Sequence, residues 1–137
     1  MKKNTLSMLA LVSGILMIAC VSVQAQSKTT RASISFDFAA ANSSMKAGEY
    51  TVQQVSAQTI LLKSADRKSH VYVMTPQSVN STNRRPQRLV FRRYGNSYFL
   101  GEIWTTEFSG MRIAPSKEEK SIAKTSDRPQ TIEIALR

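Results

Sequence analysis

The chain has 137 residues, a formal net charge of +10, one histidine and one cysteine. This length predicts a single domain. Zinc sites built from several histidine and cysteine ligands and a disulfide within the chain are excluded by these counts. A cysteine–histidine nucleophile pair is excluded because Cys20 lies in an N-terminal segment that we expect to be cleaved off, or else would be lipidated.

The first 25 residues have the three-part order of a secretory signal. Lys2 and Lys3 precede an apolar stretch over residues 6–23, and Val23-Gln24-Ala25 has the small-x-small form that signal peptidase cleaves. We therefore expect residues 1–25 to be a cleaved signal peptide and the protein to be exported, to the periplasm or outside the cell.

Two alternatives stay open for this segment. The apolar stretch is nearly long enough to anchor the chain in a membrane, which takes about 20 residues. In addition, Met17-Ile18-Ala19-Cys20 resembles a bacterial lipobox, although Met17 stands where leucine is usual. Lipidation of Cys20 would make the protein a lipoprotein.

Cleavage after Ala25 removes two lysines and lowers the net charge to +8. Such a charge attracts polyanions. Outside the cytoplasm, the expected partners are acidic polysaccharides, cell-wall polymers and anionic lipid head groups rather than nucleic acid. A basic surface that only keeps the protein soluble is the alternative interpretation.

The mature chain begins with a polar segment over residues 26–31, which we expect to be a flexible leader. In RASISFDF, Ile34, Phe36 and Phe38 alternate with polar residues, and this period of two predicts a half-buried strand. A loop follows, in which Gly48 can supply a turn conformation.

Short β-rich segments then follow over residues 50–52, 59–63 and 69–75, and each predicts a strand. Pro76 should end the last of them, because proline has no amide hydrogen for the ladder. The polar connection over residues 76–87 is the longest in the mature chain, and we expect it to be mobile.

The sequence LVFRRYGNSYFLGEIW predicts a hairpin with its turn near Gly95-Asn96. A two-residue loop would place Arg92 opposite Phe99. A three-residue loop would instead pair Phe91 with Phe99, and Arg88 with Glu102. We favour the second register, because it forms an aromatic pair and a charge pair.

The C-terminal part carries one helix signal and one strand signal. Ser116 and Glu119 have capping-box spacing, which predicts a short helix near residues 117–124, with a solvated linker as the alternative. TIEIALR, residues 131–137, alternates and predicts a closing strand. About seven strands with at most one helix indicate an all-β, mainly antiparallel domain over residues 26–137, either a small sandwich or a barrel.

No catalytic, cofactor-binding or metal-binding motif is recognisable in the sequence. His70 alternates with strand residues and is interpreted as structural. A carboxylate pair formed by Asp37 and Glu49 is the one arrangement that would allow hydrolysis without a cofactor. The calcium loop pattern and the Gly-x-Ser-x-Gly elbow do not occur.

The best binding candidate is a run of arginines next to aromatic residues. Arginine holds carboxylate and phosphate groups through paired hydrogen bonds, and aromatic rings stack on sugars or bases. Adjacent residues of a strand point to opposite sides, so Arg93 cannot join Arg92. The tentative anion-binding set is therefore Arg84, Arg85, Arg88 and Arg92. A solvated face that discourages edge pairing is the alternative.

The order of these segments resembles a group of small exported bacterial proteins that are abundant in soil acidobacteria. The similar pieces are Phe36, the AGEYTV segment, LVF with RYG and YFL, and Trp104. The resemblance covers most of the mature chain and implies export and a β fold, without an active site.

Together these features predict a non-enzymatic β domain that binds or supports structure at the cell envelope, with anionic polymers or lipids as ligands. A hydrolase that uses a carboxylate pair is one alternative. A subunit that adds its edge near residues 89–105 to a partner sheet is another.

Overall fold

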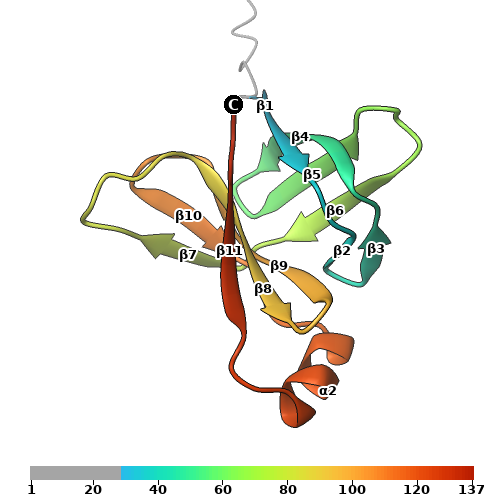
Figure 1. Ribbon diagram of the computed structural model, residues 1–137. Helices are drawn as coiled ribbons and strands as arrows, with labels where there is room; N and C mark the ends of the chain where they lie inside the picture. The colour runs from blue at the N-terminus through green and yellow to red at the C-terminus, as the bar shows by residue number, and fades with distance from the viewer. Residues whose placement is uncertain (1–28) are drawn as a thin grey trace, which may run out of the picture.

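The computed structural model describes residues 29–137. The expected signal peptide, its cleavage site and Cys20 lie outside the described residues. The described chain forms two open sheets, which confirms the all-β prediction and makes the fold a small sandwich rather than a closed barrel (Figure 1).

The first sheet has four antiparallel strands in the order β1-β4-β5-β6. Their bounds are Thr29–Ile34, Gly48–Ser56, Thr59–Ser64 and His70–Met74. Short turns join β4 to β5 and β5 to β6, whereas the connection from β1 to β4 contains the two short strands β2 and β3.

The second sheet has the order β11-β8-β9-β10-β7, and its neighbours are likewise antiparallel. The bounds in this order are Gln130–Ala135, Arg88–Tyr94, Ser97–Trp104, Ser109–Arg112 and Gln77–Asn80. A small hairpin of β2 (Phe38–Ala40) and β3 (Ser43–Met45) joins it, with β2 running parallel to β9.

The core lies between the inner faces of the two sheets. Phe91, Leu62 and Ile103 are completely buried, and they belong to one apolar cluster with residues from both sheets. Phe38 and Phe36 contribute edge-on ring contacts to Phe91, with ring centres 5.3 and 5.2 Å away. Burial of these side chains is the main source of stability.

The sheets approach each other along the edge formed by β1 and β11. There the amide of Arg31 donates to the carbonyl of Arg137 at 2.8 Å, and the amide of Arg137 donates back to Arg31 at 2.9 Å. Residues 29–31 belong to β1 and pair with β4, whereas we expected them to be part of the flexible leader.

The described residues contain eleven strands instead of about seven. The additional ones, β2, β3, β7 and β10, are only three or four residues long. Strands so short show no alternation in the sequence, and only pairing with a neighbour reveals them. In particular, β7 lies inside the connection that we expected to be mobile.

The favoured register of the β8–β9 hairpin is wrong. Tyr94 pairs with Ser97 and Arg92 with Phe99, so the loop is the two-residue turn at Gly95-Asn96, where Gly95 has φ +57°. The register shifts further along, between Val90 and Phe91. A β-bulge, which adds one residue to β9, causes this shift.

The helix prediction is confirmed as α2, Lys117–Thr125, with Ser116 as its N-cap. The Ser116 hydroxyl accepts a hydrogen bond from the Glu119 amide at 3.1 Å. The residue that α2 buries is Glu119, while its apolar residues Ile122 and Ala123 are half-buried and exposed. Figure 1 shows α2 beyond the turn of the β8–β9 hairpin, far from the C-terminus.

Candidate functional site

Three of the four arginines expected to bind anions share one groove on the outer face of the second sheet. The groove has a volume of about 580 Å³, and its charged lining residues are Arg85, Arg88, Arg92, Arg112, Glu102 and Glu133. Arg84 is outside this lining. Because carboxylates line the same groove, the charge available to a ligand depends on how the arginines are paired.

Arg88 is buried and does not lie on an exposed rim. Its side chain is 7% exposed, and its guanidinium carbon lies 4.4 Å from the centre of the Trp104 ring. The same ring covers Gly110, where a Cβ atom would lie 2.6 Å from it. Arg88 donates to the Pro86 carbonyl at 3.2 Å and lies 3.4 Å from Glu133. These contacts make Arg88 a packing residue of the outer face.

Arg92 is held by the buried Glu119 of α2. Its Nη2 donates to Oε2 of Glu119 at 2.9 Å, while its Nε contacts the other carboxylate oxygen. The Tyr94 hydroxyl donates to the same carboxylate at 3.4 Å. Burial, followed by the nearby negative charge of Glu119, raises the pKa of Tyr94. This paired geometry attaches α2 to the sheet.

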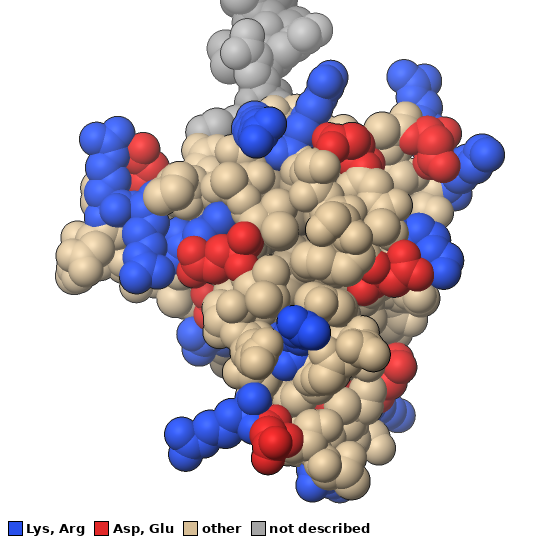
Figure 2. Space-filling view, in the orientation of Figure 1, with Lys and Arg blue, Asp and Glu red and all other residues tan. Residues whose placement is uncertain are grey.

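The other two predicted arginines form exposed ion pairs. Arg84 donates to Glu107 at 2.9 Å, and Arg85 lies 3.7 Å from Glu133. Each such pair contributes about 0–1 kcal/mol. All four predicted arginines thus face a glutamate, which leaves the cluster little charge for a ligand. Figure 2 likewise shows acidic side chains beside basic ones over the face in view.

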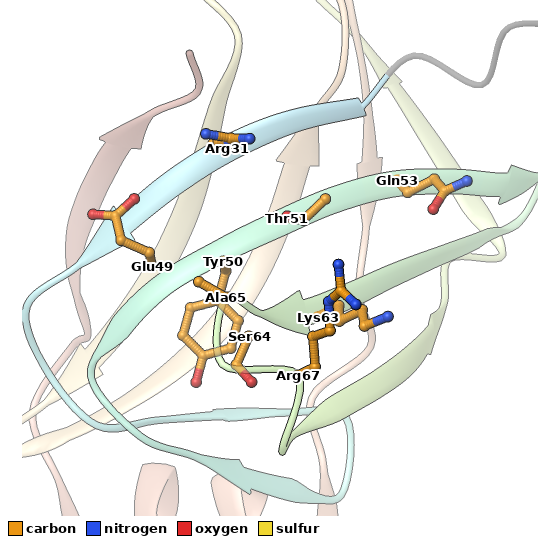
Figure 3. Close-up of a pocket in the computed structure, with 9 residues that line it drawn as sticks. All are labelled: Arg31, Glu49, Tyr50, Thr51, Gln53, Lys63, Ser64, Ala65 and Arg67. Carbon is orange, nitrogen blue, oxygen red and sulfur yellow. The ribbon is translucent and has the colours of Figure 1, made fainter.

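A different set of cations lies on the outer face of the first sheet (Figure 3). Arg31, Lys63 and Arg67 line a pocket of about 480 Å³ together with Glu49 and the polar residues Thr51, Gln53 and Ser64. Arg31 pairs with Thr51, and Thr51 pairs with Lys63, so Arg31 and Lys63 lie in one line across β1, β4 and β5. Arg67 lines the same pocket from the β5–β6 turn. We call the three cations Arg31, Lys63 and Arg67 the basic row.

The basic row keeps its charge. None of its three side chains forms an ion pair with a carboxylate of the part of the chain that the structure describes. All three residues are exposed. Figure 3 shows Arg67 reaching from the β5–β6 turn towards Lys63, while Arg31 and Glu49 lie on the other side of the pocket.

The turn that carries Arg67 is fixed by its own side chains. The Ser64 hydroxyl accepts from the Ser69 amide at 3.1 Å, and Asp66 accepts from Ser64 and from the Lys68 amide. The Ser64 bond, followed by that of the Lys68 amide, lowers the pKa of Asp66. Within this turn Arg67 adopts φ +61°, a left-handed conformation that is uncommon for a residue with a Cβ.

The sequence did not single out the basic row. Arg31 falls in the segment expected to be a leader, and Lys63 and Arg67 lie more than 30 positions later. Only the pairing of β1 with β4, and of β4 with β5, brings them to one face. One local signal for this face was present: in TILLKS, the side chain of Lys63 points to the opposite side of the strand from the apolar Leu62, and therefore away from the core.

The proposed carboxylate pair is not assembled in one place. Asp37 accepts from Lys46 at 2.8 Å and from the Ala47 amide at 2.9 Å, and these bonds lower its pKa, with the Lys46 bond as the main cause. Glu49 lines the pocket of the basic row, whereas Asp37 lines a different one. Asp37 therefore acts as a turn residue.

His70 lies on the outer face of β6, with its ring 6.0 Å from that of Tyr72. Across residues 29–137, no group of three or more histidine, cysteine, aspartate or glutamate side chains is arranged to hold a metal ion. In that same span, no helix has both the length and the apolar character needed to cross a bilayer.

We expect the substitution Glu119→Ala to lower the free energy of unfolding by about 3–5 kcal/mol, because it leaves Arg92 without its buried partner. Glu118→Ala, at the neighbouring exposed position of α2, is the control and should change it by less than about 0.5 kcal/mol. Chemical denaturation of both variants provides the measurement. Equal effects of the two would show that the Arg92–Glu119 pair does not stabilise the fold.

The chain's own geometry is the basis for choosing among these surfaces. The three cations of the basic row form no ion pair among the described residues and line one pocket, whereas the arginine groove is a network of internal ion pairs. Comparisons with protein-family models, with curated proteins and with solved structures found no match for this chain.

Proposed function

We propose that the protein is an exported, non-enzymatic binding domain of the cell envelope, and that the basic row on its first sheet holds anionic polymers. The ligand groups would be carboxylate, sulfate or phosphate, supplied by acidic polysaccharides or by lipid head groups. The N-terminal signal pattern supports export, as does the resemblance to small exported bacterial proteins. The unpaired cations support the choice of ligand.

The conformation of Arg67 is the observation that carries this proposal. A non-glycine residue in the left-handed region costs roughly 1–2 kcal/mol. Glycine would fit the same turn without that cost. Backbone strain of this kind concentrates at functional positions, where the side chain is needed. The residue in this conformation, Arg67, carries a positive charge and lines the pocket together with Lys63, so we infer that its side chain is retained for binding.

The strength of single contacts favours a polymer as the ligand. Each exposed ion pair contributes about 0–1 kcal/mol, so three cations bind one small anion weakly. A chain of repeating anions engages several cations at once and raises the overall affinity without new contacts. Thr51 adds a hydroxyl group to the same pocket.

Reversing two charges of the basic row should weaken binding. We expect Lys63→Glu combined with Arg67→Glu to lower the affinity for a carboxylated polysaccharide such as polygalacturonate by roughly tenfold at low salt. Binding of the unaltered protein should decrease as salt rises, because exposed charges are screened. Equilibrium titration at low and high ionic strength measures both effects.

The matched control is Lys117→Glu combined with Lys120→Glu on α2, which changes the net charge equally at exposed positions. Equal losses in the two double variants would mean that total charge, and not this face, attracts the polymer. Vesicles of phosphatidylglycerol, run beside the polysaccharide, identify the source of the anion. No binding to either probe at any ionic strength would contradict the proposed function.

Arg67→Gly should separate stability from binding. The substitution relieves the left-handed strain, and we expect the free energy of unfolding to rise by up to about 1 kcal/mol. The same variant should bind the polysaccharide more weakly, because a cation is lost. Denaturation and titration of one preparation measure the two quantities. A variant that is both less stable and fully active would show that Arg67 is retained for the turn alone.

Export is tested by the intact mass of the protein recovered from its native host. Cleavage after Ala25 should give a mass corresponding to residues 26–137. A larger mass, equal to residues 20–137 plus lipid, would indicate lipidation at Cys20 and an anchored protein. Recovery of the uncleaved chain from the cytoplasm would contradict the export part of the proposal.

A further inference from the structure

The strand β6 leaves one edge of the first sheet unpaired. Within residues 29–137, β6 pairs with β5 and with no other strand. Its sequence, HVYVM, contains no lysine, arginine, carboxylate or proline. Tyr72 and Met74 are exposed by 57% and 73%. Sheet edges in soluble proteins are usually protected by charge, proline, a bulge or a covering segment, and this edge has none of these protections.

The hydrogen-bond pattern shows which backbone groups are available at this edge. The Ser64 amide donates to Ser69 at 2.9 Å, and the Thr75 amide donates to Gln58 at 2.8 Å. Bonded pairs alternate along an antiparallel ladder, so Val71 and Val73 also bond to β5. The amide and carbonyl groups of His70, Tyr72 and Met74 therefore point away from the sheet.

The other edges of the sandwich differ from β6. At the opposite edge of this sheet, β1 exchanges backbone hydrogen bonds with the C-terminal residue Arg137. The edge strand of the second sheet, β7, is a polar segment of four residues that directly follows Pro76. Among the described strands, β6 thus combines an open edge with exposed apolar side chains.

We infer that β6 pairs with β6 of a second copy of this chain, in an antiparallel arrangement about a twofold axis through Tyr72. That axis places Tyr72 opposite Tyr72 of the partner subunit, and His70 opposite Met74 of the partner subunit. All three residues on each side present outward backbone groups, so each facing pair can exchange two hydrogen bonds. The edge is therefore complementary to itself, as a twofold interface requires.

The arrangement of side chains and charge fits the same partner. Tyr72 and Met74 lie on one face of the strand, so pairing would cover apolar surface that is now exposed. The cationic turn that carries Arg67 and Lys68 precedes β6 at one end. In an antiparallel pair the two turns lie at opposite ends, so their like charges are kept apart.

Neither end of the described chain lies beside this edge. The N-terminal segment enters the sheet at Thr29 in β1, three strand spacings or about 14 Å from β6. At the other end of the chain, Arg137 exchanges hydrogen bonds with Arg31 of the same strand β1.

Pairing at β6 would join two four-stranded sheets into one sheet of eight strands. The two outer faces, each with its basic row, would then form a single continuous surface. A polymer could contact both rows at once, which raises the overall affinity beyond that of one row. The dimer itself does not depend on the proposed function.

The first test is the mass of the protein in solution. In light scattering or sedimentation at physiological salt, the apparent mass should rise from one chain to two as concentration increases. Tyr72→Lys places two like charges face to face at the axis and should raise the dissociation constant roughly tenfold. The control is Phe108→Lys, which removes an aromatic side chain of similar exposure, 51%, away from β6, and it should dimerise normally.

The second test probes the register directly. Facing residues of a bonded antiparallel pair have Cα atoms about 5.5 Å apart, which a disulfide can bridge. In a Cys20→Ser background, Tyr72→Cys should form a disulfide-linked dimer under mild oxidation, whereas Phe108→Cys should not.

A single-chain mass at every concentration, or equal cross-linking of both cysteine variants, would overturn the dimer. These results are distinguishable from a failure of the proposed function. A monomer that binds polygalacturonate overturns the dimer alone, and a dimer that binds no polyanion overturns the proposed function alone.

Discussion

The bulge at Gly101 decides which residues of β9 reach the core. On the turn side of the bulge, Phe91 pairs with Leu100. On the other side, Val90 pairs with Glu102. If Gly101 were paired in a regular ladder instead of being bulged, Leu89 would face Glu102, and a charge would enter the core. Glycine suits this position, because a Cβ atom would lie 2.6 Å from Nη1 of Arg92. The packing of the two sheets and the path of Arg92 across β9 both depend on this residue.

The outer face that results is stabilised by charge pairs and not by a second apolar layer. Glu119 and Arg92 hold α2 against the hairpin, and Arg88 covers Trp104. Removal of one partner from a buried ion pair leaves the other charge uncompensated, so Arg92 and Glu119 act as one structural unit. Some of the basic residues therefore form ion pairs within the fold, and the others remain accessible to solvent or to a ligand. Net charge alone does not distinguish the two groups.

The first sheet has the opposite character. Its inner face supplies core residues such as Leu62, while its outer face carries the pocket of the basic row and ends at the open edge of β6. Weak individual contacts on such a face are effective when they repeat. A polymer ligand and a twofold partner both supply repetition, one along its own length and the other by duplicating the face. The two proposals therefore describe one strategy for binding with a small domain.

The β class, the presence of a hairpin turning near Gly95 and the helix start at Ser116 followed from the sequence alone, because alternation, turn residues and caps are local signals. The sequence did not settle the length of the hairpin loop, for which we favoured three residues and the structure has two. The short strands and the register beyond the bulge were decided by the tertiary structure, since their energies come from neighbours distant in the chain. The same holds for the site. The four arginines that lie close together in the sequence, between residues 84 and 92, form ion pairs with Glu107, Glu119 and Glu133. Arg31, Lys63 and Arg67 instead meet on one face because strand pairing brings together residues that the sequence keeps apart.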